Sequence, residues 1–307
     1  MIPFFLDAKR YDMLTYPEID PVIFSIGFLK IRWYGLMYVI GFLLAWWLAK
    51  RRCHRSDSPI NGEQVDDLVF YSMLGVIIGG RVGYALVYGT EQLLSDPLYL
   101  IKITEGGMSF HGGLAGVLIA MWLYGRKLGH SMWRMTDFVA PLVPLGLLAG
   151  RIGNFINGEL WGAPTEMPWG MRVACADNPG LCLDKLGLPL STQFTPPLHP
   201  TQLYEAVLEG AVLFALLWAF SARPRPVMAV SGLFLVGYGV FRFGVEFVRL
   251  PDAHIGYLAF GWFTMGHLLT LPMRAGDGRI VGVFQLLNKR GGNFQTGDIK
   301  ILQALAT

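Results

Sequence analysis

Long apolar runs, separated by short polar connections, are the main feature of the chain. A transmembrane helix requires about 20 mostly apolar residues to cross the hydrocarbon core of a bilayer. Six stretches approach this requirement, at residues 33–48, 68–88, 110–124, 138–155, 203–220 and 227–248, and a further apolar stretch covers 255–273. The pattern predicts an all-α protein, a polytopic transmembrane helical bundle with six clear spans and a seventh that looks truncated.

The composition supports the prediction of a membrane protein and argues against binding to nucleic acid. Of the 307 residues, 53% are hydrophobic and 15% are charged, whereas soluble domains carry about 25% charged residues. Mean hydropathy is +0.44. The formal net charge is only +3, so no strong electrostatic attraction to nucleic acid is implied. We therefore expect no nucleic-acid partner.

Basic residues follow every odd-numbered span, and the connections after even-numbered spans are longer or more acidic. The basic residues are Lys50, Arg51, Arg52 and Arg55, then Arg126, Lys127 and Arg134, then Arg223 and Arg225. Positively charged connections remain in the cytoplasm. We therefore expect the N-terminus and the long loop at about 158–200 to lie outside, and the C-terminus to lie in the cytoplasm.

Two of the three cysteines lie in this outer loop. Cys175 and Cys182 flank an Asn-Pro-Gly turn signal, and a disulfide can form outside the cytoplasm. Two free thiols are the alternative, and the sequence does not decide between them. The cysteine spacing fits no zinc pattern, so we predict no metal site.

Several ionisable residues lie at membrane depth, where they are costly and usually functional. They are Arg81, His111, Arg151, Arg242 and Glu246. Tyr238, Arg242 and Glu246 recur every four residues and so share one helix face. Structural roles are the alternatives: an ion pair within the helix for Arg242 and Glu246, a helix cap for His111, and a structural ion pair for Arg81.

The number of arginines favours a functional role. Three arginines at membrane depth exceed the carboxylates recognised there, which suggests that an anionic ligand neutralises them. The membrane supplies phosphate headgroups, and the planar guanidinium suits phosphate. The expected ligand is therefore a phospholipid.

One segment is more specific than these patterns. Residues 150–162, GRIGNFINGELWG, resemble the signature of the bacterial prolipoprotein diacylglyceryl transferases. Other segments resemble the same family: DPVIF at 20–24, WYGLMY at 33–38, GGRVGY at 79–84, GMSFHGG at 107–113, HPTQLYE at 199–205 and YGVFR at 238–242. The resemblance covers about residues 13–273.

The resemblance implies a monomeric, multi-pass enzyme of the bacterial inner membrane that needs no cofactor. It would transfer the diacylglyceryl group of phosphatidylglycerol to the lipobox cysteine of a prolipoprotein, forming a thioether and releasing glycerol phosphate. The family's important positions fall on Tyr34, His111, Arg151, Asn154, Glu159, Gly162, Tyr238, Arg242 and Glu246.

Chemistry assigns roles to these positions. The departing phosphate needs positive charge where its own charge develops, and Arg151 and Arg242 are expected to supply it. His111 is the expected general base, since imidazole titrates near neutrality. The substrate-binding set is Tyr34, Asn154, Glu159, Gly162, Tyr238, Glu246 and Arg81. Within it, we expect Glu159 and Glu246 to hold the arginines in place.

Both ends of the chain depart from the family pattern. Residues 1–12 are expected to be an extended leader, and 13–273 the transferase domain. The polar run at 274–279 interrupts the seventh span. Residues 274–307 resemble a fragment of a soluble GAF domain, with a strand at 278–289 and a helix at 296–307, and are interpreted as the result of a truncated or fused reading frame. A genuine cytoplasmic tail that packs on the enzyme is the alternative.

A transporter or a binder of anionic lipid would also use buried arginines. A transporter, however, typically contains internal repeats, and the signature at 150–162 occurs once. A binder would not need a titratable His111 near several arginines. The enzyme is therefore the preferred interpretation, and addition of mass to a lipobox peptide in the presence of phosphatidylglycerol would distinguish it from both.

Overall fold

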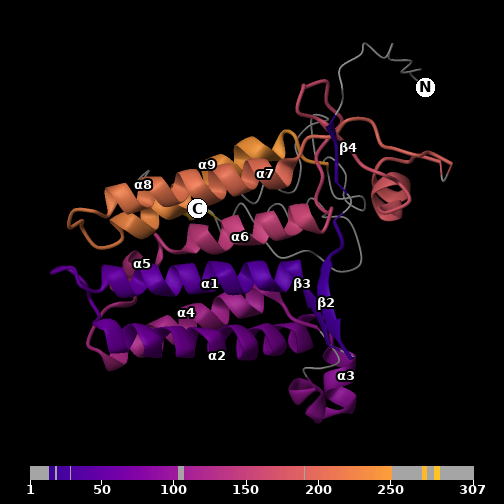
Figure 1. The fold of residues 1–307 in the computed structure, drawn as a ribbon. Coiled ribbons are helices and arrows are strands. Elements are labelled where there is room, and N and C mark those ends of the chain that lie inside the picture. Colours follow the sequence, from indigo (N-terminus) through magenta and orange to yellow (C-terminus); the bar gives the residue numbers. More distant parts are fainter. Residues whose placement is uncertain are drawn as a thin grey trace.

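The structure is a computed structural model and describes residues 14–17, 19–27, 29–102, 107–189 and 191–250, with two short strands at 272–274 and 280–283. It is mostly helical (Figure 1). The helices are α1 (Trp33–Arg52), α2 (Gly62–Val87), α3 (Thr90–Ser95), η1 (Pro97–Ile101), α4 (Phe110–Lys127), α5 (Met132–Val139), α6 (Val143–Ile156), η3 (Leu181–Lys185), α7 (Thr201–Glu205), η4 (Ala206–Val212), α8 (Leu213–Phe220) and α9 (Ala229–Glu246). The strands are β1 (Leu14–Thr15), β2 (Val22–Ile26), β3 (Leu29–Arg32), β4 (Met171–Arg172), β5 (Pro272–Arg274) and β6 (Ile280–Val283).

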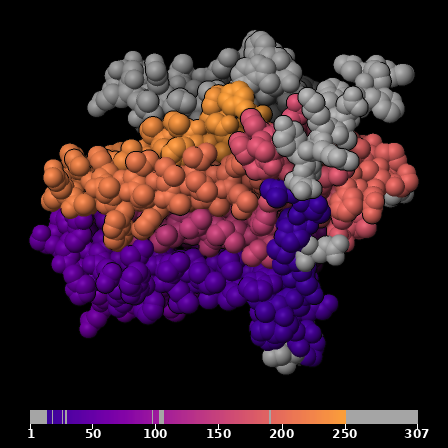
Figure 2. All heavy atoms as spheres, turned by 45° about the horizontal axis from the view of Figure 1, so that its top comes forward, coloured from indigo at the N-terminus to yellow at the C-terminus, as the bar shows by residue number. Residues whose placement is uncertain are grey.

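The long helices lie along a common direction in successive layers. The layer of α7, α8 and α9 lies on α6, α6 lies on α1, and α4 and α2 follow (Figure 1). The space-filling view shows the same sequence of layers, with the N-terminal helices in indigo and residues 201–220 in orange (Figure 2). The predicted helical bundle is therefore confirmed as the main architecture.

All six predicted apolar stretches are helical. Fewer than six of them are long and apolar enough to count as membrane spans. Four helical segments of the described chain are long and apolar enough to cross a membrane: α1, α2, the continuous segment Thr201–Phe220 and α9. The predicted span at 138–155 is instead two helices, α5 and α6, bent by 49° and countable as a fifth span. α4 is helical over its predicted length without being among these segments.

Large apolar side chains cover the outer faces of the helices. Ile78 and Leu86 of α2, Leu123 of α4 and Val240 of α9 are all more than half exposed, at 60%, 59%, 55% and 63%. A soluble protein rarely exposes so much contiguous apolar surface. These faces therefore fit a hydrocarbon environment.

Glycines allow α2 and α4 to approach each other closely. A Cβ added to Gly79 would lie 2.3 Å from the carbonyl oxygen of Gly112, and one added to Gly116 would lie 2.0 Å from the carbonyl oxygen of Gly75. This is the close packing that small residues at four-residue spacing permit in membranes. Gly79 and Gly112 therefore let the backbones of the two helices approach each other.

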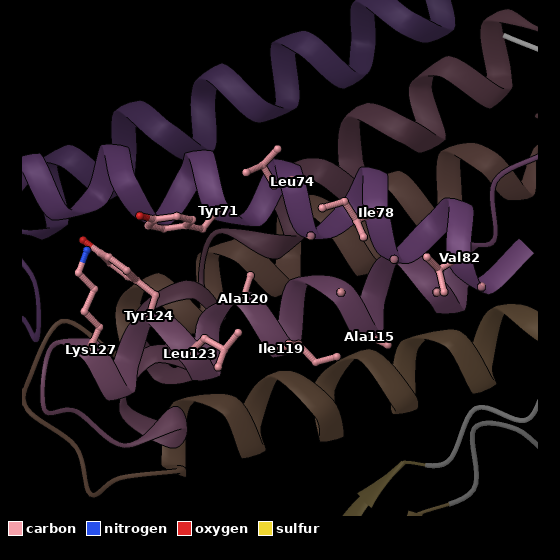
Figure 3. A pocket seen from close by; sticks show the side chains of 15 residues that line it. Tyr71, Leu74, Ile78, Val82, Ala115, Ile119, Ala120, Leu123, Tyr124 and Lys127 are labelled. Atoms are coloured by element: carbon pink, nitrogen blue, oxygen red, sulfur yellow. The ribbon is translucent and has the colours of Figure 1, made fainter. Parts of the chain in front are cut away.

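A groove of about 610 Å³ follows this helix pair. Figure 3 shows Leu74 and Ile78 of α2 and Ile119 and Leu123 of α4 along it, with Lys127 at one end. Its walls are almost wholly apolar, so it offers no chemistry beyond contact with hydrocarbon.

The loop between α6 and α7 has its own small core of Trp161, Val173 and Leu198. Cys175 and Cys182, in the same loop, are joined by a disulfide. The sequence left open whether these two thiols are bridged or free, and the structure shows them bridged. β1 pairs in parallel with β4 beside this core, and β2 pairs with β3 in an antiparallel hairpin just before α1. These short strand pairs, which the all-α prediction omitted, lie at one end of the bundle, at the right of Figure 1.

The C-terminal expectations are tested only in part. β5 and β6 form an antiparallel pair, so residues 272–274 are extended rather than the end of a seventh helix. The expected strand at 278–289 agrees with β6 over Ile280–Val283. The expected leader at 1–12, the apolar stretch at 255–271 and the helix at 296–307 lie outside the described residues.

Candidate active site

A π-helical segment brings two glutamates into the bundle core. Glu205 ends α7, and Glu209 lies one turn later in η4, where the helix widens. Both side chains are 0% exposed. Single π-helical turns within α-helices occur frequently at functional sites. The two carboxylates therefore indicate a candidate active site in the bundle core.

Three arginines converge on these carboxylates from two other parts of the chain. The Arg151 Nε atom, from α6, lies 3.0 Å from Oε2 of Glu205. On the other side, Nη1 of Arg249 donates a hydrogen bond of 2.9 Å to Oε1 of Glu205, and Nη1 of Arg242 lies 3.5 Å from the same oxygen. Glu205 thus contacts all three guanidinium groups.

Glu246 and Glu209 complete the cluster. Glu246 lies 2.7 Å from Nη1 of Arg242, one turn away on α9, and 3.5 Å from Nε of Arg249. Glu209 makes a longer contact of 3.7 Å with Nη2 of Arg151, and neither of its oxygens accepts a hydrogen bond from the described residues. The ion pair expected within α9 is present, but as one part of a larger Arg–Glu cluster.

This cluster overturns the argument from surplus arginine. The cluster contains Arg151, Arg242 and Arg249 against Glu205, Glu209 and Glu246, so the formal charges balance. A buried charge requires a partner, and two of the three partners are Glu205 and Glu209, which the sequence pattern did not single out. Affinity for an anion must therefore come from how the arginines are oriented rather than from excess charge.

The arginine side chains of the cluster are less buried than the glutamates. The side chains of Arg151, Arg242 and Arg249 are 19%, 15% and 16% exposed, whereas those of the glutamates are 0% to 6% exposed. Each guanidinium has five N–H donors, and the glutamates engage only some of them. The arginines therefore keep donors that a ligand could use, while the carboxylates lie in the core.

Tyr238 lies beside this cluster on α9, one turn before Arg242. Its ring stacks on Phe234 at a centroid distance of 6.1 Å, and it packs at the edge of the apolar cluster formed by Ala140, Leu213, Leu217 and Val230. The predicted grouping of Tyr238, Arg242 and Glu246 on one helix face is confirmed.

A polar group adjoins the cluster at the end of α6. Nδ2 of Asn154 and Nδ2 of Asn157 each donate a hydrogen bond of 3.1 Å to Oε1 of Glu159. The Tyr34 phenol lies near Asn154 and Glu159 and 2.9 Å from the hydroxyl of Tyr38. Glu159 was expected to hold an arginine, but its contacts are instead to two amides.

Gly162 lies where three chain segments meet. An added Cβ would approach the carbonyl oxygen of Val248 to 2.4 Å and the Thr201 Cγ2 atom to 2.6 Å. Gly162 also bridges to Arg249 and donates its N–H to the carbonyl of His199. It therefore allows the end of α9, and Arg249 with it, to reach the start of α7.

His199 and Tyr204 flank this junction. Nδ1 of His199 lies 3.0 Å from the Tyr204 hydroxyl, which accepts a hydrogen bond from Nε1 of Trp169. Burial lowers the pKa of His199 below its usual value. The imidazole is therefore neutral at pH 7, as suits a group that orients the entry to α7 through hydrogen bonds.

Arg81 lies apart from the cluster, near the end of α2. Its guanidinium donates to the carbonyl oxygens of Tyr99, Leu100, Lys102 and Gly107, and it lies over the Tyr99 ring at 4.4 Å. The side chain is only 3% exposed. These contacts fasten the connection between α2 and α4.

His111 is in the first turn of α4. Ser109, not His111, caps this helix by accepting a hydrogen bond of 3.2 Å from the N–H of Gly112. Nε2 of His111 is buried and has no hydrogen-bond partner among the described residues. Within the same residues, no ion pair or hydrogen bond joins His111 to the arginines of the cluster. The alternative of a capping His111 is therefore wrong, and its ring remains available to a substrate.

Sequence reasoning missed Glu205, Glu209 and Arg249. A signal was present, because Glu205 and Glu209 are ionisable, lie four residues apart and fall within the apolar stretch 203–220. The rule that singled out Arg242 applies to them equally. Within the described part of the chain no group of three His, Cys, Asp or Glu side chains could hold a metal ion.

The fold and the site define a helical membrane protein whose polar core presents arginine donors held by buried glutamates. The sequence model of the family described as prolipoprotein diacylglyceryl transferase matches residues 21–281. The chain belongs to this family.

Relatives named phosphatidylglycerol–prolipoprotein diacylglyceryl transferase are similar over most of their length. That of Methylococcus capsulatus is 59% identical over 262 residues, covering 85% of this chain and 94% of the relative. That of Oleidesulfovibrio alaskensis is 55% identical, covering 92% and 100%. That of Pseudomonas fluorescens is 53% identical, covering 86% and 93%.

Proposed function

We propose that this protein transfers the diacylglyceryl group of phosphatidylglycerol to the cysteine thiol of a prolipoprotein. The observation that carries the proposal is the cluster of Arg151, Arg242 and Arg249, which buried glutamates hold while the arginine side chains stay 15–19% exposed. Guanidinium donors suit a phosphate diester, and the names of the relatives carry the same two substrates.

The reaction forms one bond and breaks one. The thiol sulfur bonds to the terminal glyceryl carbon as the bond from that carbon to the phosphate oxygen breaks. The thiol proton leaves the sulfur, and the released glycerol phosphate carries the electron pair of the broken bond. Arg151 and Arg242 stabilise the charge that develops on this phosphate.

The remaining site residues bind and position the substrates in this proposal. His111 accepts the thiol proton through its unpartnered Nε2. Tyr34, Asn154 and Tyr238 contact lipid oxygens, and Glu246 fixes Arg242 and Arg249. Glu159 orients the Asn154 amide, and Gly162 allows Arg249 to approach. Arg81 acts on the site indirectly, by holding the α2–α4 connection.

The membrane arrangement is part of the proposal. The protein lies in the bacterial inner membrane as a monomer, with its N-terminus outside and α4 and a seventh segment completing the spans. The basic residues at one end of the bundle face the cytoplasm, since positively charged connections remain there. The Arg–Glu cluster then lies in the outer half, where prolipoprotein lipoboxes emerge.

Residues 13–273 carry the transferase, and 274–307 lie outside it in this proposal. Support comes from the site residues, all of which precede 273. The resemblance of the tail to a GAF fragment is a separate proposal. The family match ends at residue 281 and does not test it. A chain that ends at residue 283 should keep its rate within about twofold, and a tenfold loss would make the tail part of the enzyme.

Incubation of the purified protein with phosphatidylglycerol and a lipobox peptide tests the reaction. The peptide thiol should gain the mass of one diacylglyceryl group, and glycerol phosphate should appear in equal amount. A peptide with serine in place of cysteine is the control. Absence of the mass gain, with the chain shown to be folded, would contradict the proposal.

A further inference from the structure

A second basic site lies at the opposite end of the bundle from the Arg–Glu cluster. It is a pocket of about 230 Å³ between the end of α1, the start of α5 and the connection from α8 to α9, which meet at the left of Figure 1. Five arginines line it: Arg52, Arg55, Arg134, Arg223 and Arg225.

The two carboxylates in its wall are already engaged. Asp57 accepts hydrogen bonds of 2.9 and 3.1 Å from Arg55. Asp137 accepts the N–H groups of Met228 and Ser231 at 2.6 and 2.8 Å, and the Ser231 hydroxyl at 2.6 Å, and so caps the start of α9. Arg55 pairs with Asp57, so the other four arginines have only the charge of Asp137 to offset theirs, and an excess of three formal positive charges remains.

Neutral groups fix two of those arginines. Nη1 of Arg52 donates to the hydroxyl of Ser221 at 2.8 Å, and this serine is 2% exposed. Nε of Arg225 donates to the carbonyl oxygen of Phe220 at 2.8 Å. Both guanidinium groups keep further donors, because each contact engages only one of five N–H groups.

The other two arginines are exposed and carry no partner. Arg134 and Arg223 make no hydrogen bond, ion pair or ring contact through their side chains in the described part of the chain. Beneath them the pocket floor is apolar, with Phe138 and Val230 at 3% and 4% exposure. The pocket therefore combines exposed, unpartnered positive charge with an apolar floor.

We propose that this pocket binds a phosphate group, carried either by the headgroup of an anionic phospholipid or by a soluble phosphate compound. The arginine fork matches phosphate oxygens, and one phosphate would offset part of this excess charge. The pocket is smaller than the usual 300–1,000 Å³ of small-molecule sites, which fits a headgroup and not its acyl chains. The proposal stands on this pocket alone and does not depend on the transferase reaction.

A double variant and a matched control test it. Arg134→Gln with Arg223→Gln removes two arginines of the pocket. Arg51→Gln with Arg126→Gln removes two arginines from the same end of the bundle, where they lie over Trp47 and Trp122 outside the pocket. Native mass spectrometry of the full chain would count bound phosphatidic acid, with phosphatidylcholine as the neutral reference.

The expected result is at least a tenfold weaker retention of one phosphatidic acid molecule in the pocket variant, with the control like the wild type. Ser221→Ala, which frees Arg52 without changing charge, should weaken retention severalfold. Inorganic phosphate at millimolar concentration that displaces this molecule and stabilises the protein against heat would identify a soluble phosphate compound as the ligand. Displacement by lipid alone would identify a headgroup.

Two results would overturn the proposal. One is equal weakening in both double variants, which would reduce the effect to general surface charge. The other is unchanged retention in the pocket variant and in Ser221→Ala. The thermal midpoint without ligand checks folding, and it should match the wild type because Arg134 and Arg223 contribute no contact to the fold.

Discussion

Glu205 lies 3.0 Å from Arg151 across the contact between α7 and α6, and its other carboxylate oxygen lies 2.9 Å from Arg249. One fully buried carboxylate therefore connects the arginine of the family signature to the end of α9. Because both oxygens are engaged by guanidinium groups, Glu205 fixes the direction in which each arginine presents its remaining donors.

Glu205→Gln should reduce turnover by at least tenfold and lower stability by roughly 3 kcal/mol. Removal of one charge from a buried ion cluster leaves its partners uncompensated, which typically costs this much. Glu166→Gln is the control, because Glu166 is exposed in the outer loop. Peptide lipidation rates measure the effect on turnover, and thermal midpoints measure the effect on stability. A normal rate in Glu205→Gln would show that the arginines keep their orientation without the Glu205 charge.

Arg151→Lys and Arg242→Lys should each lower turnover by about tenfold or more, equivalent to ~1.4 kcal/mol of transition-state stabilisation. Lysine keeps the charge but lacks the planar fork that contacts a glutamate and a phosphate at once. Single-turnover rates separate this loss from weaker lipid binding. Rates near the wild type in both variants would remove these residues from phosphate stabilisation.

His111→Gln should lose most activity at neutral pH and regain part of it as the pH rises. The reason is that a cysteine thiol, with a pKa of about 8.5, ionises without a base at higher pH. The measurement is the pH profile of the lipidation rate between about pH 6.5 and 9. A variant with a normal rate and an unchanged profile would leave His111 without a role in proton transfer.

Gly112→Ala and Gly113→Ala should differ sharply although the residues are adjacent. A Cβ at Gly112 would lie 2.2 Å from the carbonyl oxygen of Gly79, whereas one at Gly113 meets nothing closer than 3.6 Å. The first must separate α2 from α4 and should lower the thermal midpoint by several degrees. The second should be neutral, and equal midpoints for the two variants would refute the close packing.

Cys175 and Cys182 should resist thiol reagents in intact spheroplasts until a reductant is added. Loss of the bridge in Cys175→Ser/Cys182→Ser should cost about 2 kcal/mol, the value expected for closing so short a loop. The variant Cys53→Ser, which lacks the unbridged thiol, should show the same protection. Labelling of both cysteines without reductant would contradict the disulfide.

Helix positions were largely predictable because the signal is local. Runs such as 33–48 and 227–248 are mostly apolar, and any helix there lies in the same hydrocarbon. The prediction failed at 138–155, where Ala140, Pro141 and Leu142 separate α5 from α6. Hydropathy alone does not report a bend, because bent and straight helices bury the same apolar side chains.

The sequence predicted part of the candidate site's membership, and it did not predict the pairing between helices. Burial cost singled out Arg151, Arg242 and Glu246, and the signature at 150–162 added Asn154 and Glu159. Arg151 pairs with Glu205, which lies in a different helix. Rules based on residue spacing apply only within one helix, so they could not predict this pair. The same limit explains why the carbonyl oxygens of the α2–α4 connection were not foreseen as partners of Arg81.

The sequence by itself determined the membrane class, the helix order and the residues whose burial demands an explanation, because hydropathy and motif are properties of short segments. Only the tertiary structure decided which charge neutralises which. Electrostatic energy depends on distances between side chains brought together by packing, so the balance of three arginines against three glutamates became visible only once α6, α7 and α9 were placed side by side.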